Sequence, residues 1–195
     1  FENVISGGKK SPIPVLTNLF AHKDRIAYGL GLESQRDLRK LGELLSFMKN
    51  PEPPSSLKET FAMIPLAKRV LSMPPKKVKK GSCQEIVNLK PNIYDLPIQK
   101  CWPDDISPLI TWPLVVTKGT GSEKTDCYNM GIYRLQPIAE DKLIVRWLKM
   151  RGGAEHLVKW QKQNGKAMPA AMVLGASPSV TLAGVMPIPN NMSEY

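Results

Sequence analysis

An amide, a carboxylate and three arginines that follow one another between residues 129 and 194 have types that would suit a phosphate bridged by a metal ion. Asn129 offers an amide oxygen and Glu194 a carboxylate. Hard cations such as Mg²⁺ and Mn²⁺ prefer oxygen ligands and often keep a substrate phosphate in their coordination shell. The alternative is structural, because an isolated Asn in a strand is usually an edge residue and a Glu near a terminus is usually solvated.

Three arginines, Arg134, Arg146 and Arg151, fall within 18 positions. The planar guanidinium group grips a phosphate or a carboxylate with two parallel hydrogen bonds, so the three side chains have the chemistry to surround an anion. Ordinary surface arginines are the alternative, which composition alone favours. Arg146, however, has two apolar residues on each side. Because an unpaired buried charge is costly, we expect Arg146 to have a partner.

Gly152 and Gly153 follow the last of these arginines. Glycine allows a close approach of the backbone, which suits amide N–H groups that point at a phosphate. A plain turn without a ligand explains the pair equally well. The chain has neither a Walker A loop nor a G-x-G-x-x-G dinucleotide motif.

The histidines and tryptophans add less. His22 and His156 are the only histidines, and we expect His156 to be a half-exposed residue of a helix. No Ser/His/Asp or Cys/His arrangement is apparent, so nucleophilic hydrolysis is not expected. We expect Trp112 and Trp147 to form walls of a cofactor pocket and Trp160 to pack in the core.

Several motifs in this order resemble the UbiD family of decarboxylases, which use a prenylated flavin and act on polyprenyl-hydroxybenzoate. The resemblance covers essentially the whole chain. The motifs that carry it are Cys-Trp-Pro-Asp-Asp at 101–105, Pro-Leu-Ile-Thr-Trp at 108–112, Asn-Met-Gly-Ile-Tyr-Arg at 129–134, Arg-Trp-Leu at 146–148, Arg-Gly-Gly at 151–153 and Pro-Ile-Pro-Asn-Asn-Met-Ser-Glu-Tyr at 187–195.

The resemblance implies a site. Asn129 and Glu194 would bind Mn²⁺ or Mg²⁺, and Arg134 would also hold the substrate carboxylate as the catalytic residue. A monovalent ion such as K⁺ would be bound by backbone carbonyls near 184–186. The residues implied to contact prenylated flavin mononucleotide (FMN) are Ile132, Tyr133, Arg134, Arg146, Trp147, Leu148, Arg151 and Gly152.

The resemblance also implies a reaction, the non-oxidative decarboxylation of an aromatic acid with a polyprenyl tail. The expected substrate is 3-polyprenyl-4-hydroxybenzoate in ubiquinone biosynthesis, with a flavin prenyltransferase supplying the cofactor and with assembly into a homo-oligomer. The chain opens at Phe1 and stops at Tyr195, which we interpret as a fragment without its N-terminal start and its C-terminal half. The family's catalytic acid would follow the Ser-Glu-Tyr sequence, so the fragment alone is expected to be inactive.

Two other classes of function remain open. One is a reductase-type or non-catalytic domain that binds ordinary FMN. The other is an interaction module acting through the lysine run at 76–80, supported by a net charge of +10. The run lacks interleaved aromatic residues, so nucleic acid is not expected; a solvated linker or an anionic membrane surface remains. We expect a cytoplasmic protein in peripheral contact with the inner face of the cell membrane, and cysteines that are free and packed.

The elements that would position the site fall into an α+β arrangement of two parts. Residues 1–80 predict a partial α/β lobe and a linker at 74–82. The lobe has a short buried strand over 14–20, an amphipathic helix from Ser34 to Asn50 and a helix over 56–72 interrupted near Pro65.

Residues 81–195 predict a flavin-binding domain that is truncated at its end. Its expected strands cover 109–118, 128–137, 142–150 and 170–174, with helices over 154–163 and 177–184. Several strands with short helices between them suggest a β-barrel-like domain. The resemblance sharpens this to a split β-barrel related to flavin reductases.

Overall fold

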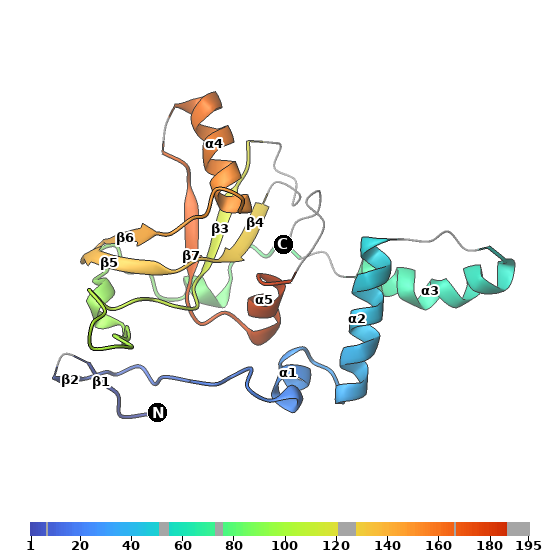
Figure 1. Ribbon diagram of the computed structural model, residues 1–195, viewed down its shortest axis with the longest axis horizontal. Coiled ribbons are helices and arrows are strands. Elements are labelled where there is room, and N and C mark those ends of the chain that lie inside the picture. Colours follow the sequence, from blue (N-terminus) through green and yellow to red (C-terminus); the bar gives the residue numbers. More distant parts are fainter. Residues whose placement is uncertain (7, 51–54, 73–75, 121–127, 166, 187–195) are drawn as a thin grey trace.

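A three-stranded antiparallel sheet lies at the centre of the protein in the computed structural model (Figure 1). The structure describes residues 1–6, 8–50, 55–72, 76–120, 128–165 and 167–186. The sheet has the order β4-β3-β7 and is built from β3 (Leu114–Lys118), β4 (Tyr128–Ile132) and β7 (Ala170–Val173). Beside it, β5 (Leu135–Ala139) pairs with β6 (Lys142–Val145).

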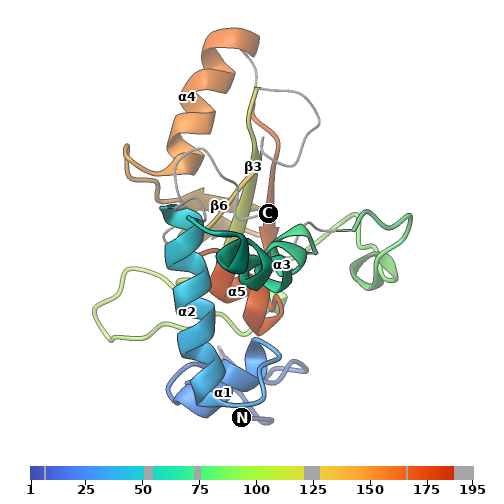
Figure 2. The same cartoon turned by 90° about the vertical axis from the view of Figure 1, so that its right-hand side faces the viewer.

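Helices cover both faces of the central sheet. The register places Thr117 opposite Asn129 and Val115 opposite Gly131, and helix α4 (Gly152–Asn164) contacts both of these strands. Helix α5 (Pro178–Ala183) lies near the other face, where a Cβ atom on Gly184 would come within 2.5 Å of the Leu114 side chain. Figure 2 shows these helices from a second side, with α4 and α1 at opposite ends of the molecule and α5 between them.

The core lies between the α4 side of the sheet and the inner face of the β5–β6 pair. Its fully buried members are Val115 and Leu135, joined by Tyr133, which is 8% exposed. Four partly buried side chains pack against them: Ile110, Leu143, Val145 and Trp147.

The predicted strands of this part are present but shorter than expected. The run over 128–137 is two strands, because the chain leaves β3 after Ile132 and pairs with β6 from Leu135. The run over 109–118 forms a strand only from Leu114, directly after Pro113, which has no N–H for a ladder. The run over 142–150 ends as a strand at Val145.

The mixed α and β class is confirmed, whereas a split barrel is not. The described strands form separate sheets of three, two and two strands, and these sheets are not closed on themselves. The predicted helices over 154–163 and 177–184 and the strand over 170–174 correspond to α4, α5 and β7.

The N-terminal part differs more from its prediction. It consists of a short pair β1 (Ile5–Ser6) and β2 (Lys9–Lys10), followed by α1 (Lys23–Gly29), α2 (Gln35–Lys49) and α3 (Leu57–Leu71). The buried strand over 14–20 is wrong, because this segment has no regular structure. Helix α2 is confirmed with Ser34 and Asn50 as its caps, but α3 runs through Pro65 without the expected interruption.

Among the described residues, a ring contact and a helix contact join the N-terminal part to the central sheet region. The rings of Phe20 and Trp112 lie 5.6 Å apart between centroids. A Cβ atom on Gly29 would lie 2.7 Å from Pro178 Cβ, so α1 packs closely on the start of α5. Helices α2 and α3 extend away from the sheets in Figure 1. No described helix has the length and apolar character needed to cross a membrane.

Two short 3₁₀ helices, η1 (Ser82–Gln84) and η2 (Ile93–Asp95), lie between these parts. The N–H group of Ile93 donates to the carbonyl of Glu140 at 2.7 Å, which ties η2 to the turn between β5 and β6. The described portion of the predicted linker, residues 76–80, has no helix or strand and is exposed.

Candidate functional site

Three residues of the Asn-Met-Gly-Ile-Tyr-Arg motif share one face of the chain as it leaves β4. Asn129, Gly131 and Tyr133 alternate along an extended backbone, so their side-chain positions point the same way, toward α4. The Tyr133 ring lies directly over Gly131, where a Cβ atom would come within 2.8 Å of the ring. The absence of a side chain at Gly131 therefore lets Tyr133 reach back to Asn129.

The Tyr133 hydroxyl joins β4 to the start of α4. It donates a hydrogen bond to Asn129 Oδ1 at 3.2 Å and accepts one from the Gly153 N–H at 3.3 Å. Its ring also packs edge-on against Trp147, with centroids 6.0 Å apart and planes at 78°. The tyrosine is thus held at both its ring and its hydroxyl.

Both glycines at the start of α4 are in close contact with this cluster. A Cβ atom on Gly152 would lie 2.8 Å from Asn129 Cγ, and one on Gly153 would lie 3.1 Å from Trp147 Nε1. A side chain at Gly152 would therefore displace the Asn129 amide, whereas one at Gly153 would need a small shift of the Trp147 ring. The same closeness brings the N-terminus of α4, the end of a helix that favours anions, beside Asn129.

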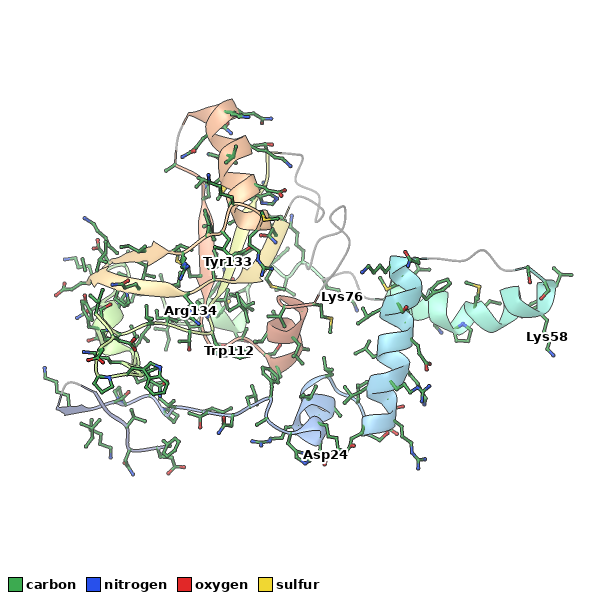
Figure 3. The ribbon with its side chains drawn as sticks, in the orientation of Figure 1. Asp24, Lys58, Lys76, Trp112, Tyr133 and Arg134 are labelled. Atoms are coloured by element: carbon green, nitrogen blue, oxygen red, sulfur yellow. The ribbon has the colours of Figure 1, made fainter. Side chains whose placement is uncertain are left out.

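Arg134 and Arg146 lie on the opposite face from Tyr133. The Arg146 N–H donates to the Arg134 carbonyl at 3.2 Å, which makes the two residues neighbours across the strand pair. Figure 3 shows Arg134 next to Tyr133, where β4 passes into β5. Both arginine side chains are exposed, so the burial from which a partner was expected for Arg146 is not observed. Its apolar neighbours in sequence alternate, with Val145 and Trp147 packing against the core.

The Arg134–Arg146 pair places two positive charges side by side. Like charges directly opposite each other on a strand pair are destabilising unless an anion lies between them. Within the described ranges, neither arginine forms an ion pair. The arginine pair and the exposed Arg151 each have the chemistry to bind a phosphate-bearing group such as a flavin nucleotide. The α4 N-terminus also favours an anion, but it lies on the Tyr133 side of the chain, opposite the face of the pair.

The other residues expected to contact the cofactor are divided between the two faces. Trp147 is partly buried on the inner face, whereas Leu148 is 55% exposed. Ile132 is the last residue of β4 and is half-buried. The structure therefore brings the predicted site residues of 129–153 into one region, but it turns them in two directions.

The predicted metal ligands are only partly described. Asn129 is half-buried in β4, and Glu194 lies outside the described residues. Over the described part of the chain, no group of three or more His, Cys, Asp and Glu side chains is arranged to hold a metal ion. An amide oxygen is a suitable ligand for Mg²⁺ or Mn²⁺, but a site would need donors beyond Asn129.

His156 lies closer to this region than the sequence indicated. Its Nδ1 atom is 2.9 Å from Thr117 Oγ1, and Thr117 is fully buried and pairs with Asn129 across the sheet. His156 is half-buried on the face of α4 that meets the sheet. Its position three residues after Gly153, on the same side of a helix, was the available signal.

Some expected roles fall elsewhere. Trp112 is 56% exposed and lies against Phe20, with the two ring planes tilted by 35°. Trp160 is half-buried, and its indole N–H is buried without a described partner. Cys83 and Cys101 are exposed, so the expectation that they are packed is wrong; Cys127 lies outside the described residues. The segment 184–186 follows α5, and its role in binding K⁺ stays a prediction.

Two family profiles match the chain. The profile of the 3-octaprenyl-4-hydroxybenzoate carboxy-lyase Rift-related domain matches residues 76–195. The profile of the N-terminal domain of the same carboxy-lyase matches residues 1–45.

Solved structures match nearly the whole chain. The vanillic acid decarboxylase of Sedimentibacter hydroxybenzoicus in closed form is 24% identical with a TM-score of 0.67, over 91% of this chain and 34% of that one. The enzyme HmfF from Pelotomaculum thermopropionicum in complex with FMN is 20% identical with a TM-score of 0.69, over 94% and 36%. The 3,4-dihydroxybenzoic acid decarboxylase from Enterobacter cloacae is 20% identical with a TM-score of 0.59, over 90% and 32%. These likenesses establish the fold, and the chain spans about a third of the length of the structures it matches.

Proposed function

The chain belongs to the UbiD family of carboxy-lyases, and we propose on this basis that it is part of an enzyme that removes CO₂ from an aromatic acid. The single observation that carries the proposal is the exposed Arg134–Arg146 pair, whose two positive charges are neighbours across the β5–β6 strand pair. These charges suit a phosphate and a carboxylate, the two anions that a flavin nucleotide and an aromatic acid would bring.

In this proposal the chain holds prenylated FMN and a divalent metal, Mn²⁺ or Mg²⁺. Arg146, Arg151 and the start of α4 would bind its phosphate, with Asn129 and Glu194 supplying oxygen ligands to the metal. Removing CO₂ from an aryl carbon leaves an unstable carbanion, and the bound flavin would supply an electron sink. Arg134, on the exposed face, would orient the substrate carboxylate.

The proposed substrate is a 3-polyprenyl-4-hydroxybenzoate in ubiquinone biosynthesis. The family description names a prenylated hydroxybenzoate, and two similar structures are decarboxylases of vanillic and 3,4-dihydroxybenzoic acids. These names support the class of aromatic acid. The polyprenyl tail is the finer part of the proposal, and comparing tailed with untailed hydroxybenzoates as substrates would test it.

The experiment uses the full-length protein co-expressed with a flavin prenyltransferase and supplied with Mn²⁺. We expect intact mass and absorbance to show a bound prenylated flavin, and CO₂ release from aromatic acids that depends on it. Arg36→Ala, which removes an exposed arginine of α2, is the matched control for Arg134→Ala. Binding of unmodified FMN without metal, with NAD(P)H-dependent reduction and no CO₂ release, would instead support the reductase-type alternative.

Two partners belong to the proposal. We expect a homo-oligomer, and one similar structure is described as an evolved dimeric form of HmfF; light scattering of the full-length protein tests this. We also expect the exposed lysines of 76–80 to face anionic lipids on the inner side of the cell membrane. Co-sedimentation with phosphatidylglycerol vesicles but not with phosphatidylcholine vesicles, lost in a variant with these four lysines replaced by glutamine, would support that contact.

A further inference from the structure

We propose that α3 is an amphipathic helix that lies in the surface of an anionic lipid bilayer, with its exposed apolar side chains among the lipids. The idea rests in part on the proposed contact between the lysines of 76–80 and anionic lipids, and it adds an apolar surface to that contact. It is independent of the metal, the flavin and the decarboxylation.

One face of α3 presents an exposed apolar stripe. Its members are spaced by three, four and seven residues, which places their side chains on one side of a helix. Their exposed fractions run from 54% to 81%, and they are Leu57, Phe61, Ile64 and Leu71. No other described helix or strand packs extensively on α3, which extends away from the sheets in Figure 1. An exposed apolar surface of this kind marks a place where another molecule or a membrane docks.

The charges around the stripe favour anionic lipid as the occupant. Residues 56–80 contain six lysines, one arginine and a single acidic residue. Lys58 lies at the end of α3 that is far from the sheets, and Lys76 lies beyond the other end (Figure 3). Basic groups at both ends of an apolar face are complementary to a bilayer, in which anionic headgroups cover apolar chains.

The same charges disfavour a second copy of the chain as the occupant. Lys68 is exposed within the stripe, between Ile64 and Leu71. Two stripes packed face to face would place this lysine among the apolar side chains of the other copy, and an unpaired buried charge is costly. At a bilayer the long lysine side chain keeps its amine in the headgroup layer while its stem follows the apolar face. Lipid therefore suits both kinds of side chain.

The experiment measures co-sedimentation of the full-length protein with phosphatidylglycerol vesicles, without substrate. We expect the double variant Leu57→Gln, Phe61→Gln to bind at least about 10-fold more weakly, because it removes two large apolar side chains from the lipid and keeps residues suited to a helix. The matched control is Ile86→Gln, Leu89→Gln, which replaces two residues outside α3 that are each 89% exposed. Its binding should equal that of the wild type.

A second measurement uses the wild type alone. Hydrogen exchange of the α3 amides should slow when the vesicles are added, because lipid then shields the helix and opposes its opening. This result decides the matter even where the double variant folds poorly. Unchanged exchange in α3 overturns the proposal.

The remaining outcomes separate α3 from the lysines. Weaker binding of the double variant with an unchanged control supports the proposal, and unchanged binding of the double variant overturns it. If the glutamine variant of 76–80 then has lost binding, the lysine contact stands without α3. A wild type that does not bind vesicles overturns both. A lower melting temperature of the double variant with unchanged vesicle binding means that another part of the protein covers the stripe. A dimer that this variant abolishes, again with unchanged vesicle binding, means that a second copy covers it.

Discussion

Gly152 packs against Asn129 so closely that a Cβ atom on the glycine would lie 2.8 Å from Cγ and 2.9 Å from both terminal atoms of the asparagine. The glycine that begins α4 and the asparagine in the middle of β4 therefore form one packed unit. Any side chain at the first position must displace the amide at the second.

Gly152→Ala should consequently weaken Mn²⁺ binding and reduce stability by about 1–3 kcal/mol, the usual cost of overpacking a filled site. Gly42→Ala is the control, because no atom lies within 4 Å of a Cβ there, in the middle of α2. That control should gain about 0.5–1 kcal/mol from helix propensity. Urea unfolding and a Mn²⁺ titration measure both variants, and a harmless alanine at 152 would contradict the packing.

Gly131→Ala should be more harmful to the fold than Gly152→Ala. Its Cβ atom would meet the Tyr133 ring at 2.8 Å, and the ring is held from the other side by Trp147. We expect a lower midpoint in urea unfolding and faster hydrogen exchange of the Gly153 amide, whose acceptor is the Tyr133 hydroxyl. Unchanged exchange at Gly153 would show that the ring has another place to go.

Arg134→Ala should weaken flavin binding without lowering the stability of the fold. Removing one of two neighbouring positive charges relieves a repulsion of about 0.2–1 kcal/mol, so the protein without ligand should be as stable as the wild type or slightly more. Flavin binding should weaken by about 10–100-fold, because hydrogen bonds to charged groups are worth about 1.5–3 kcal/mol. In a full-length protein we also expect turnover to be lost; retained turnover would remove Arg134 from the site.

Glu194→Gln should lose metal and flavin together, if this carboxylate is a ligand to the metal that holds the phosphate. The amide keeps the size of the side chain but not its charge, and hard cations favour carboxylates. Metal analysis and flavin absorbance of the purified full-length protein measure the two losses. A variant that keeps its metal would end the assignment of Glu194.

The start of α2 should respond to acid through Asp37. A hydrogen bond from Lys40 at 2.9 Å, and then one from the Ser34 hydroxyl at 2.9 Å, lower the pKa of Asp37 below its ordinary value. The stabilisation by these bonds is therefore present above the ordinary pKa and is lost as the pH falls through the lowered one. Asp37→Asn should lower the melting temperature slightly at neutral pH and leave it unchanged in strong acid.

The sequence was sufficient to predict elements whose apolar residues recur at a clear helical period. It was less informative where a strand changes its pairing partner. Leu38, Leu41 and Leu44 predicted α2 because their spacing follows a helix. The alternation from 128 to 137 is the same on both sides of Arg134, so it could not reveal that β4 pairs with β3 and β5 with β6. Pairing between distant segments decides this, and periodicity carries no information about it.

The candidate site divides in the same manner. Residue types and motifs indicated Asn129, the arginines and the glycine pair, because the chemistry of these residues can be recognised from the sequence alone. The exposure of Arg146 and the burial of Tyr133 could not be predicted from the sequence, because both depend on which face of a strand meets α4 and the core. The nearness of His156 to Thr117 likewise requires the helix to be placed on the sheet.

The alternation of inward and outward positions in the β5–β6 pair separates two kinds of change that a protein engineer would make. Gln136 and Ile144 are paired on the outer face with Arg134 and Arg146, while Leu135 and Val145 pair on the inner face. Replacing Gln136 or Ile144 should change the surface next to the arginines and leave the hydrogen bonds of Tyr133 unchanged. This face thus offers a place to retune ligand preference without rebuilding the interior.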